Sequence, residues 1–481
     1  MKIHQFLATA AILFLSACGG GGSSNANNPP PPPAGGIVRT GFAIGPITTF
    51  GSVVVNGVHY STTNAVITVD DSPGTEDDLR VGQVVLVRGS IDDNLTTGTA
   101  DEIRFDGNVE GPIESIDLLT GVLVVLGQTV RTDSETSFDN NIQPASLAGL
   151  VAGDIVEVSG LVMVDGSVAA TRVEKKAAGL PFDVHGIVSN LDTANFRFSL
   201  NSLVVDYSGA TLDNFPGGQI SAGNSVEAKG NGFDGSGRLI ATRVEFESPV
   251  TGDADDHVEI EGFITRFASA QDFDVSGLPV STSNGTVFSG GTAADLGLNV
   301  KVEVEGSLNA PGTLVATKVD IRRGAAVRTT ALVDSVNAAG NSLVMLGITV
   351  NIDALTRLED KSSANVRPLT INDLNTGDYL EVRGTEQPAG SAQILASLLE
   401  RNDADARTIL QGFVTSASAP SFTILGVTVT TNGSTQFQDT DGSSISSATF
   451  FSRAAAGTLV KARGTETSAT AITADEVQLQ Q

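Results

Sequence analysis

Short apolar runs that alternate with polar residues recur along the chain from residue 37 to its end. Typical segments are Phe273–Val275 and Leu278–Val280, which are joined by a two-residue turn that ends in glycine. Alternation with a period of two places Phe273 and Val275 on one face of a strand. A glycine-containing turn between two such runs is typical of a β-hairpin. The pattern therefore predicts many short strands and little helix.

A second pattern, Gly-Asp-x-Val-Glu-Val-x-Gly, marks a longer strand that we call the central strand. It occurs at residues 153–160 and 377–384, with weaker versions at 82–89, 223–230, 299–306 and 457–464. Asn299 replaces the first glycine in one copy, and Asn, like Gly, tolerates a left-handed backbone. The valines alternate with an acidic residue, so we expect this residue to face solvent on the outer wall. The residues concerned are Glu157, Glu227, Glu303 and Glu381.

Three further sequence features recur at the same spacing as the central strand. Each unit opens with a small residue and an apolar strand, such as Gly186–Ser189, and closes with an Ala-led strand, such as Ala241–Glu245. Several copies add a Thr-x-Phe segment, such as Thr435–Phe437. Marks in a fixed order at a spacing of roughly 65 to 75 residues indicate about six tandem repeats. The predicted bounds are 37–108, 109–181, 182–257, 258–326, 327–407 and 408–481.

Each unit thus holds five or six short strands. So few strands have too little area for two packed sheets, and closure into a small barrel removes the exposed edges. We therefore expect an all-β protein of about six tandem small barrels, with an OB-like barrel as the nearest pattern analogy. One short polar helix fits before the central strand, near residues 143–149 or 370–375. Acidic or polar stretches at residues 248–257 and 401–407 are the expected linkers.

The N-terminus has the pattern of an export signal. Lys2 precedes an apolar run at residues 6–15, which is long enough for a signal peptide but too short to span a bilayer. Residues 15–18, Leu-Ser-Ala-Cys, resemble the lipobox of bacterial lipoproteins. That resemblance implies that residues 1–17 are removed and that Cys18 is lipidated, so that acyl chains hold the protein at a membrane. Gly19, rather than Asp, implies the outer membrane.

Residues 18–36 follow as Cys-Gly-Gly-Gly-Gly-Ser-Ser-Asn-Ala-Asn-Asn-Pro-Pro-Pro-Pro-Pro-Ala-Gly-Gly. After Cys18 this stretch holds no apolar side chain larger than Ala, so nothing offsets the entropy of ordering it. We interpret it as a disordered linker. The lipobox, this linker, the segment Gly51–Val58 and the repeated central strands together resemble the DUF5666 domain-containing repeat lipoproteins of proteobacteria. The resemblance covers nearly all of the chain after Gly36 and implies no catalytic motif.

The amino-acid composition limits the kinds of molecule that this protein is expected to bind. The formal net charge is -27 and the pI is near 4.3, so the chain repels DNA, RNA and anionic membrane surfaces, and we expect no nucleic-acid partner. Cys18 is the single cysteine, so no internal disulfide forms and the folded part has no thiol chemistry.

Candidate site residues are few. Apart from His4, the histidines are His59, His185 and His257, which fall in different units or a linker, so we interpret them as solvated or structural. The acidic runs at residues 70–78 and 253–256 are dense enough to consider calcium, although neither matches an EF-hand loop. The candidate calcium ligands are Asp253, Asp255 and Asp256, where an ion would stiffen the joint between the third and fourth repeats; solvated loops are the alternative.

No set of titratable residues marks a pocket, so we expect no catalytic residue, no cofactor other than calcium, and no enzyme activity. The favoured function is a non-catalytic binding or adhesion module of the cell envelope, on the periplasmic or the outer face. It would bind an unknown protein or carbohydrate ligand, and the repetition of the unit along the chain would increase the avidity. Only Tyr60, Tyr207 and Tyr379 suggest carbohydrate stacking. The alternatives are a ligand-free structural spacer and a hydrolase, and the latter requires acidic residues to converge in one unit.

Overall fold

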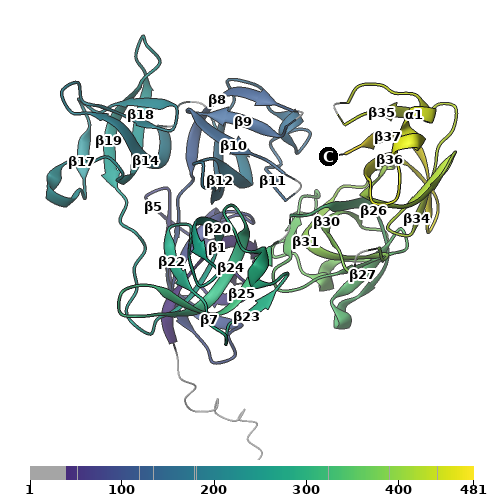
Figure 1. Ribbon diagram of the computed structural model, residues 1–481, viewed down its shortest axis with the longest axis horizontal. Coiled ribbons are helices and arrows are strands. Elements are labelled where there is room, and N and C mark those ends of the chain that lie inside the picture. The colour runs from purple at the N-terminus through teal and green to yellow at the C-terminus, as the bar shows by residue number, and fades with distance from the viewer. Residues whose placement is uncertain are drawn as a thin grey trace, which may run out of the picture. The chain divides into compact units, whose positions relative to one another are not determined.

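The computed structural model describes residues 39–480 except 51, 119, 134, 178, 180, 323, 389 and 441. The predicted signal peptide, Cys18 and the linker lie outside the described residues. Figure 1 shows the described part as small β-barrels, with β1 of the first repeat beside β20 of the fourth. Among the described residues, no helix is long and apolar enough to cross a membrane.

The strands and short 3-10 helices of the first three repeats follow one plan. Repeat 1 holds β1 (Arg39–Thr49), β2 (Val53–Val55), β3 (Val58–Ser61), β4 (Val66–Val69), β5 (Ser72–Gly74), η1 (Glu76–Asp78), β6 (Val84–Ile91) and β7 (Thr97–Phe105). Repeat 2 holds β8 (Val109–Asp117), β9 (Val122–Val125), β10 (Gln128–Arg131), β11 (Ser137–Phe138), η2 (Leu147–Gly149), β12 (Ile155–Val162) and β13 (Val168–Lys175). Repeat 3 holds β14 (Phe182–Asp192), β15 (Arg197–Leu200), β16 (Leu203–Asp206), β17 (Thr211–Asp213), η3 (Pro216–Gly218), β18 (Ser225–Phe233) and β19 (Leu239–Phe246).

The last three repeats use the same order. Repeat 4 holds β20 (His257–Ser269), β21 (Asp272–Val275), β22 (Leu278–Ser281), β23 (Val287–Ser289), η4 (Ala293–Asp295), β24 (Lys301–Leu308) and β25 (Leu314–Arg322). Repeat 5 holds β26 (Val327–Asn337), η5 (Ala338–Gly340), β27 (Ser342–Met345), β28 (Ile348–Asn351), β29 (Arg357–Asp360), η6 (Ile371–Asp373), β30 (Tyr379–Glu386) and β31 (Gln393–Asn402). Repeat 6 holds β32 (Thr408–Ser418), β33 (Ser421–Ile424), β34 (Val427–Thr430), β35 (Gln436–Gln438), α1 (Ser447–Arg453), β36 (Leu459–Ser468) and β37 (Ala471–Leu479).

Each barrel closes by the same ring of strand pairs. In repeat 4 the opening strand β20 pairs with β21, β21 with β22, β22 with β25, β25 with β24, and β24 with β20 again. The pair β22–β25 is parallel and the others are antiparallel. A closed ring leaves no long unpaired edge, and five strands in this order form an OB-like barrel. The predicted all-β fold of small OB-like barrels is therefore confirmed.

Neighbouring barrels continue each other's sheets. The strands form three hydrogen-bonded sheets of 13, 12 and 12 strands. Repeats 2 and 3 join through the antiparallel pair β8–β14, and repeats 5 and 6 through β26–β32. Repeat 1 joins repeat 4 through the parallel pair β1–β20, in which Gly41 lies opposite His257. The barrels are therefore coupled by backbone hydrogen bonds as well as by the covalent chain.

The local patterns predicted from the sequence are confirmed. The hairpin β21–β22 turns where predicted, and Phe273 and Val275 both lie in the buried core. The first residue of the central-strand motif is left-handed, with φ of 92° at Gly153 and 61° at Asn299. The helix expected before the central strand is present as one-turn 3-10 helices at η2 and η6. The helix α1 in repeat 6 was not predicted from the sequence.

The Thr-x-Phe segment has a structural role that the sequence did not reveal. The hydroxyl of Thr435 donates a hydrogen bond to the carbonyl of Ala474 on the closing strand, at 2.6 Å. Equivalent bonds from Thr136 to Ala170 and from Thr286 to Ala316 measure 2.7 and 2.8 Å. Each bond ties the loop after the hairpin to the barrel wall.

Both predicted linkers are shorter than expected. The linker predicted at residues 401–407 loses Arg401 and Asn402 to β31, where they pair with Leu380 and Tyr379 of β30. The strand β20 begins at His257, and this side chain is buried, so His257 belongs to the opening strand of repeat 4 and not to the linker. The linker assignment of His257 from acidic composition is wrong, because the backbone of this residue pairs with both β1 and β24.

Candidate functional site

The expectation that the central-strand glutamates face solvent is wrong. The exposed fractions of Glu157, Glu227, Glu303 and Glu381 are 2%, 3%, 4% and 8%. The alternation itself is correct, because Val156 and Val158 on either side of Glu157 point into the barrel. The glutamates stand on the outer wall, but other side chains and other repeats cover that wall.

These glutamates belong to rows of residues that cross three strands of a barrel. Each row joins one residue of the opening strand, the central-strand glutamate and one residue of the closing strand. The rows are Glu110–Glu157–Glu174, His185–Glu227–Glu245, Glu261–Glu303–Asp320 and Thr330–Glu381–Glu400. Like charges directly opposite each other destabilise a sheet, so every row needs cations beside it.

Lysines and arginines supply this positive charge. The Nζ of Lys176 lies 2.5 Å from Glu157 Oε2, and Nη2 of Arg328 lies 2.5 Å from Glu381 Oε2. Some cations bridge repeats, since Lys301 of repeat 4 lies 3.4 Å from Glu135 Oε2 of repeat 2. A cavity of about 540 Å³ beside Lys301 is lined by such paired charges, so its polar groups mostly neutralise one another.

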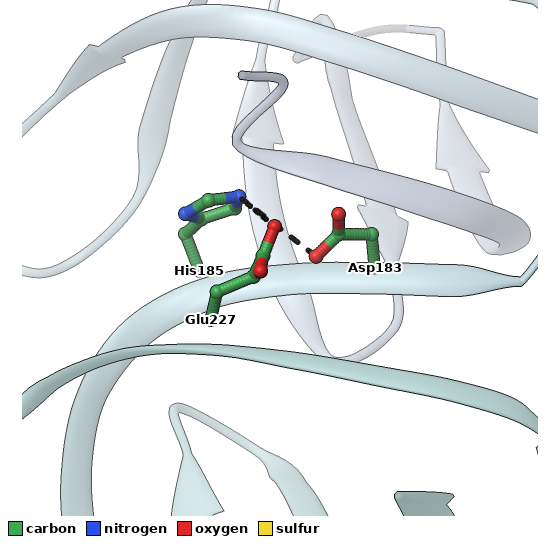
Figure 2. A group of neighbouring side chains, drawn as sticks. All are labelled: Asp183, His185 and Glu227. Carbon is green, nitrogen blue, oxygen red and sulfur yellow. Dashed lines mark ion pairs between the residues drawn. The ribbon is translucent and has the colours of Figure 1, made fainter. Parts of the chain in front are cut away.

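The row in repeat 3 differs because it contains a histidine. Asp183 and His185 stand two residues apart on β14, and Glu227 lies opposite His185 on β18 (Figure 2). The His185 Nε2 atom lies 3.5 Å from Glu227 Oε1 and 3.8 Å from Asp183 Oδ1. On the other side of the ring, Nδ1 lies 2.7 Å from Glu247 Oε1. The geometry gathers one imidazole nitrogen and two carboxylate oxygens around one point.

The three converging atoms lack hydrogen bonds. Asp183 Oδ1, His185 Nε2 and Glu227 Oε1 are each fully buried and have no hydrogen-bond partner. Lys229 provides the nearest charge, with Nζ 3.0 Å from Glu227 Oε1 and 3.1 Å from Asp183 Oδ2. Among the described residues, these three side chains are one of the groups whose ligand atoms lie within 4.8 Å of one another.

Burial and charge shift the titration of this group. Burial and the charge of Asp183 raise the pKa of Glu227 to about 7, against the opposing charges of His185 and Lys229. Burial lowers the pKa of His185, but the hydrogen bond and charge of Glu247, with the charges of Asp183 and Glu227, outweigh it and raise that pKa to about 10. The site therefore favours a positive charge at its centre.

The other histidines are placed differently. His59 is exposed on β3, where its Nδ1 lies 3.3 Å from Ser52 Oγ. His257 is buried, with Nε2 3.1 Å from Glu259 Oε1. The prediction that His59 and His185 lie in different repeats holds, and His257 belongs to a third. The sequence interpretation overlooked that carboxylates, rather than further histidines, gather around His185 and His257.

The predicted calcium ligands form a local turn. Asp256 Oδ2 accepts a hydrogen bond from the Asp253 amide at 2.8 Å, and Oδ1 accepts one from Thr40 Oγ1 at 2.8 Å. Asp255 adopts a left-handed φ of 73°. In the other acidic run, Asp71 pairs with Arg243 at 2.8 Å and Asp78 caps η1. Calcium binding at Asp253, Asp255 and Asp256 stays a prediction.

The exposure of the tyrosine and phenylalanine side chains also differs from what the sequence suggested. Tyr60, Tyr207 and Tyr379, considered for carbohydrate stacking, are all buried. The exposed aromatic rings of repeat 3 are Phe196 at 52% and Phe233 at 39%. Phe196 lies in a turn after Asn195, and Phe233 ends β18 after Gly232, so the neighbouring Asn and Gly are the signal that the sequence offered for their exposure.

Comparison with known proteins identifies the repeats. No curated protein matches the chain. A solved structure titled "drosophila Unr CSD456" shares 14% identity, with 45% of this chain and 98% of that chain covered, at a TM-score of 0.12. The family described as "Domain of unknown function (DUF5666)" matches residues 44–104, 110–174, 185–245, 261–320, 330–400 and 411–478. These six matches cover most of the chain, which therefore belongs to the DUF5666 family.

Proposed function

We propose that the protein is a non-catalytic binding module of the cell envelope, held at the outer membrane through lipidated Cys18. The lipobox and the linker after it support the anchor. Coupled barrels support the binding role, because a scaffold joined by continuous sheets holds surface side chains in fixed positions. The ligand class that we favour is an envelope carbohydrate.

The observation that carries this proposal is the presence of two exposed aromatic rings in repeat 3, one near each end of β14. Phe233 stacks on Phe182 with ring centroids 5.4 Å apart, and Phe196 packs edge-on against Tyr207 at 5.7 Å. A ring that is half exposed but held by a second ring loses little entropy on binding. Flat apolar faces at barrel loops suit sugar rings, and OB-like barrels bind oligosaccharides with loops and strands of this kind.

The test is cosedimentation of the full chain with purified peptidoglycan sacculi. The double variant Phe196→Ser with Phe233→Ser should bind at least about tenfold more weakly, since each buried ring contributes about 1 kcal/mol or more. The matched control is Val66→Ser, which removes an equally exposed apolar side chain from repeat 1. Binding that is absent in the unchanged chain, or equal in the double variant, would contradict the proposal.

The ligand-free spacer is the second candidate. It is favoured by the pairing of repeat 1 with repeat 4 and by ion pairs such as Lys301–Glu135, which couple repeats without presenting a ligand site. Sacculi and envelope glycans that bind neither the full chain nor its variants would favour this spacer over the binding module.

A further inference from the structure

We propose that Asp183, His185 and Glu227 form a binding site for a divalent transition metal of the zinc type in the wall of repeat 3. The three residues lie on the adjacent strands β14 and β18 and direct one nitrogen and two oxygens at a common point (Figure 2). The site is distinct from the exposed rings of the proposed function, so either proposal can fail without the other.

The spacing of the atoms fits a metal ion. Zinc binds imidazole nitrogen and carboxylate oxygen at about 2.0 to 2.2 Å, and tetrahedral ligands at that distance lie about 3.4 Å apart. The distances from His185 Nε2 to Glu227 Oε1 and to Asp183 Oδ1 are 3.5 and 3.8 Å. An ion at the centre would thus contact all three atoms after small side-chain movements.

A proton does not satisfy the same atoms. If His185 is neutral with its proton on Nδ1 toward Glu247, the lone pair of Nε2 faces two carboxylate oxygens, an arrangement that is repulsive unless a cation lies between them. If Nε2 is protonated, 3.5 Å is too long for a good hydrogen bond to Glu227. Buried polar atoms are normally paired, so Asp183 Oδ1 and His185 Nε2, which have no hydrogen-bond partner, indicate a missing ligand beside Glu227 Oε1.

Lys229 fills this role only for Glu227. Its Nζ lies 3.0 Å from Glu227 Oε1 and 3.1 Å from Oδ2 of Asp183, not Oδ1, and it is shared with Asp71 of repeat 1 at 3.1 Å. With His185 protonated, the carboxylates of Asp183, Glu227 and Glu247 against Lys229 and His185 leave one negative charge (three minus two). A divalent cation that takes the place of the imidazole proton adds one positive charge and removes that imbalance.

The ligand set indicates the class of metal. Calcium and magnesium prefer oxygen ligands, whereas an imidazole nitrogen with carboxylates suits zinc and its neighbours. Glu247 supports this assignment, because metal-bound histidine usually donates its other ring N–H to a carboxylate, which fixes the ring. The 2.7 Å contact between His185 Nδ1 and Glu247 provides that arrangement.

The experiment measures Zn²⁺ binding to the full chain without a histidine tag. All proteins carry Cys18→Ser, so that no thiol competes for the metal. After treatment with a chelator, calorimetry should show one tight Zn²⁺ per chain in the parent protein. His185→Gln should weaken binding at least 100-fold, and Glu247→Gln, which removes only the supporting carboxylate, by about 10- to 100-fold.

The matched control is His257→Gln, which removes the other buried histidine, whose Nε2 already has a carboxylate partner at 3.1 Å. It should bind Zn²⁺ as the parent does. The proposal is overturned if the parent binds no Zn²⁺ tightly, or if His185→Gln binds it equally well. Should His185→Gln fail to fold, zinc X-ray absorption of the His257→Gln variant decides, because this variant lacks the second group of one histidine and two carboxylates, His257, Glu259 and Glu305. One imidazole with oxygens then supports the site, and oxygens alone overturn it.

Discussion

Neutralising Glu381 should destabilise repeat 5 more than any surface charge change. Glu381 is buried on β30 between two guanidinium groups: Nε of Arg383 donates to its Oε1 and Nη2 of Arg328 donates to its Oε2, each at 2.5 Å. The substitution Glu381→Gln keeps the size of the side chain but removes the nearest counter-ion of both cations, and the next carboxylate beside Arg383, that of Glu400, lies 4.0 Å away. Removing one partner of a buried ion pair costs about 3 to 5 kcal/mol.

The lowered pKa of Glu381 gives a second, independent value for the free energy that this carboxylate contributes to folding. Burial raises its pKa, but the charges and hydrogen bonds of Arg383 and Arg328 outweigh burial and lower it to about 2. Compared with an ordinary glutamate pKa of about 4.3, this is worth about 3 kcal/mol of folding stability at neutral pH. Because the folded pKa is the lower one, this contribution is present above about pH 4.3 and is lost as the pH falls through about 2.

The assay should resolve single barrels, because one two-state free energy is not defined for a chain of several domains. Hydrogen exchange of peptides from β30 meets this need, and about 3 kcal/mol corresponds to a fall in protection on the order of 100-fold. The control is Glu476→Gln in repeat 6, whose pair with Arg463 spans 3.7 Å between partly exposed side chains. Such a pair contributes at most about 1 kcal/mol.

Two results would refute this reasoning. One is a change in β30 protection that is no larger in Glu381→Gln than in the Glu476→Gln control at neutral pH. The other is an equal loss of stability in the parent and the Glu381→Gln variant as the pH falls from 5 to 2, since only the parent has this carboxylate to protonate.

Three further predictions follow from the barrel itself. Gly306→Ala at the bulge of β24 should cost about 1 to 3 kcal/mol, because a Cβ there meets the carbonyl of Val315, whereas Gly297→Ala, which meets nothing, should be nearly neutral in thermal unfolding. Thr435→Val should lose about 1 kcal/mol or more in the same measurement, and Thr415→Val, whose exposed hydroxyl donates at 3.3 Å, should lose less. If calcium binds at Asp253, Asp255 and Asp256, small-angle scattering of the full chain should show a stiffer particle with calcium than with a chelator. An unchanged profile would contradict the linker site and leave the oxygens of Asp256 to their hydrogen bonds with Asp253 and Thr40.

The parts of the fold that were predicted from the sequence depend on neighbouring residues. Hairpins, the left-handed positions at Gly153 and Asn299, and the one-turn helix at residues 147–149 follow from turn chemistry and period-two alternation. The parallel pairing of Gly41 with His257 joins residues more than 200 positions apart, and no local pattern encodes it. The burial of the central-strand glutamates depends on such distant contacts, which is why it was missed.

The candidate site could have been predicted from the same period-two alternation of the strands. Asp183 and His185 stand two apart on an opening strand, so they share a face, and the opening strand pairs with the central strand that carries Glu227. Treating the three histidines as separate from the glutamates hid this. The missing step was the pairing register of β14 with β18, which places His185 opposite Glu227 and not one residue away.

The rows of residues that cross three strands also help to explain why each barrel packs against one particular barrel and not another. Six repeats of one family present almost the same backbone, so apolar contacts alone discriminate poorly between them. The central-strand position varies little in four repeats, but the opening-strand residue of the row changes from Glu110 to His185, Glu261 and Thr330. A buried charge without its partner costs several kcal/mol, so a barrel docked against the wrong neighbour would leave Glu135 of repeat 2 without its partner Lys301 of repeat 4. The acidic rows thus give each barrel wall its own pattern of charges to be paired, and the metal ion proposed for repeat 3 would meet part of that need together with Lys229.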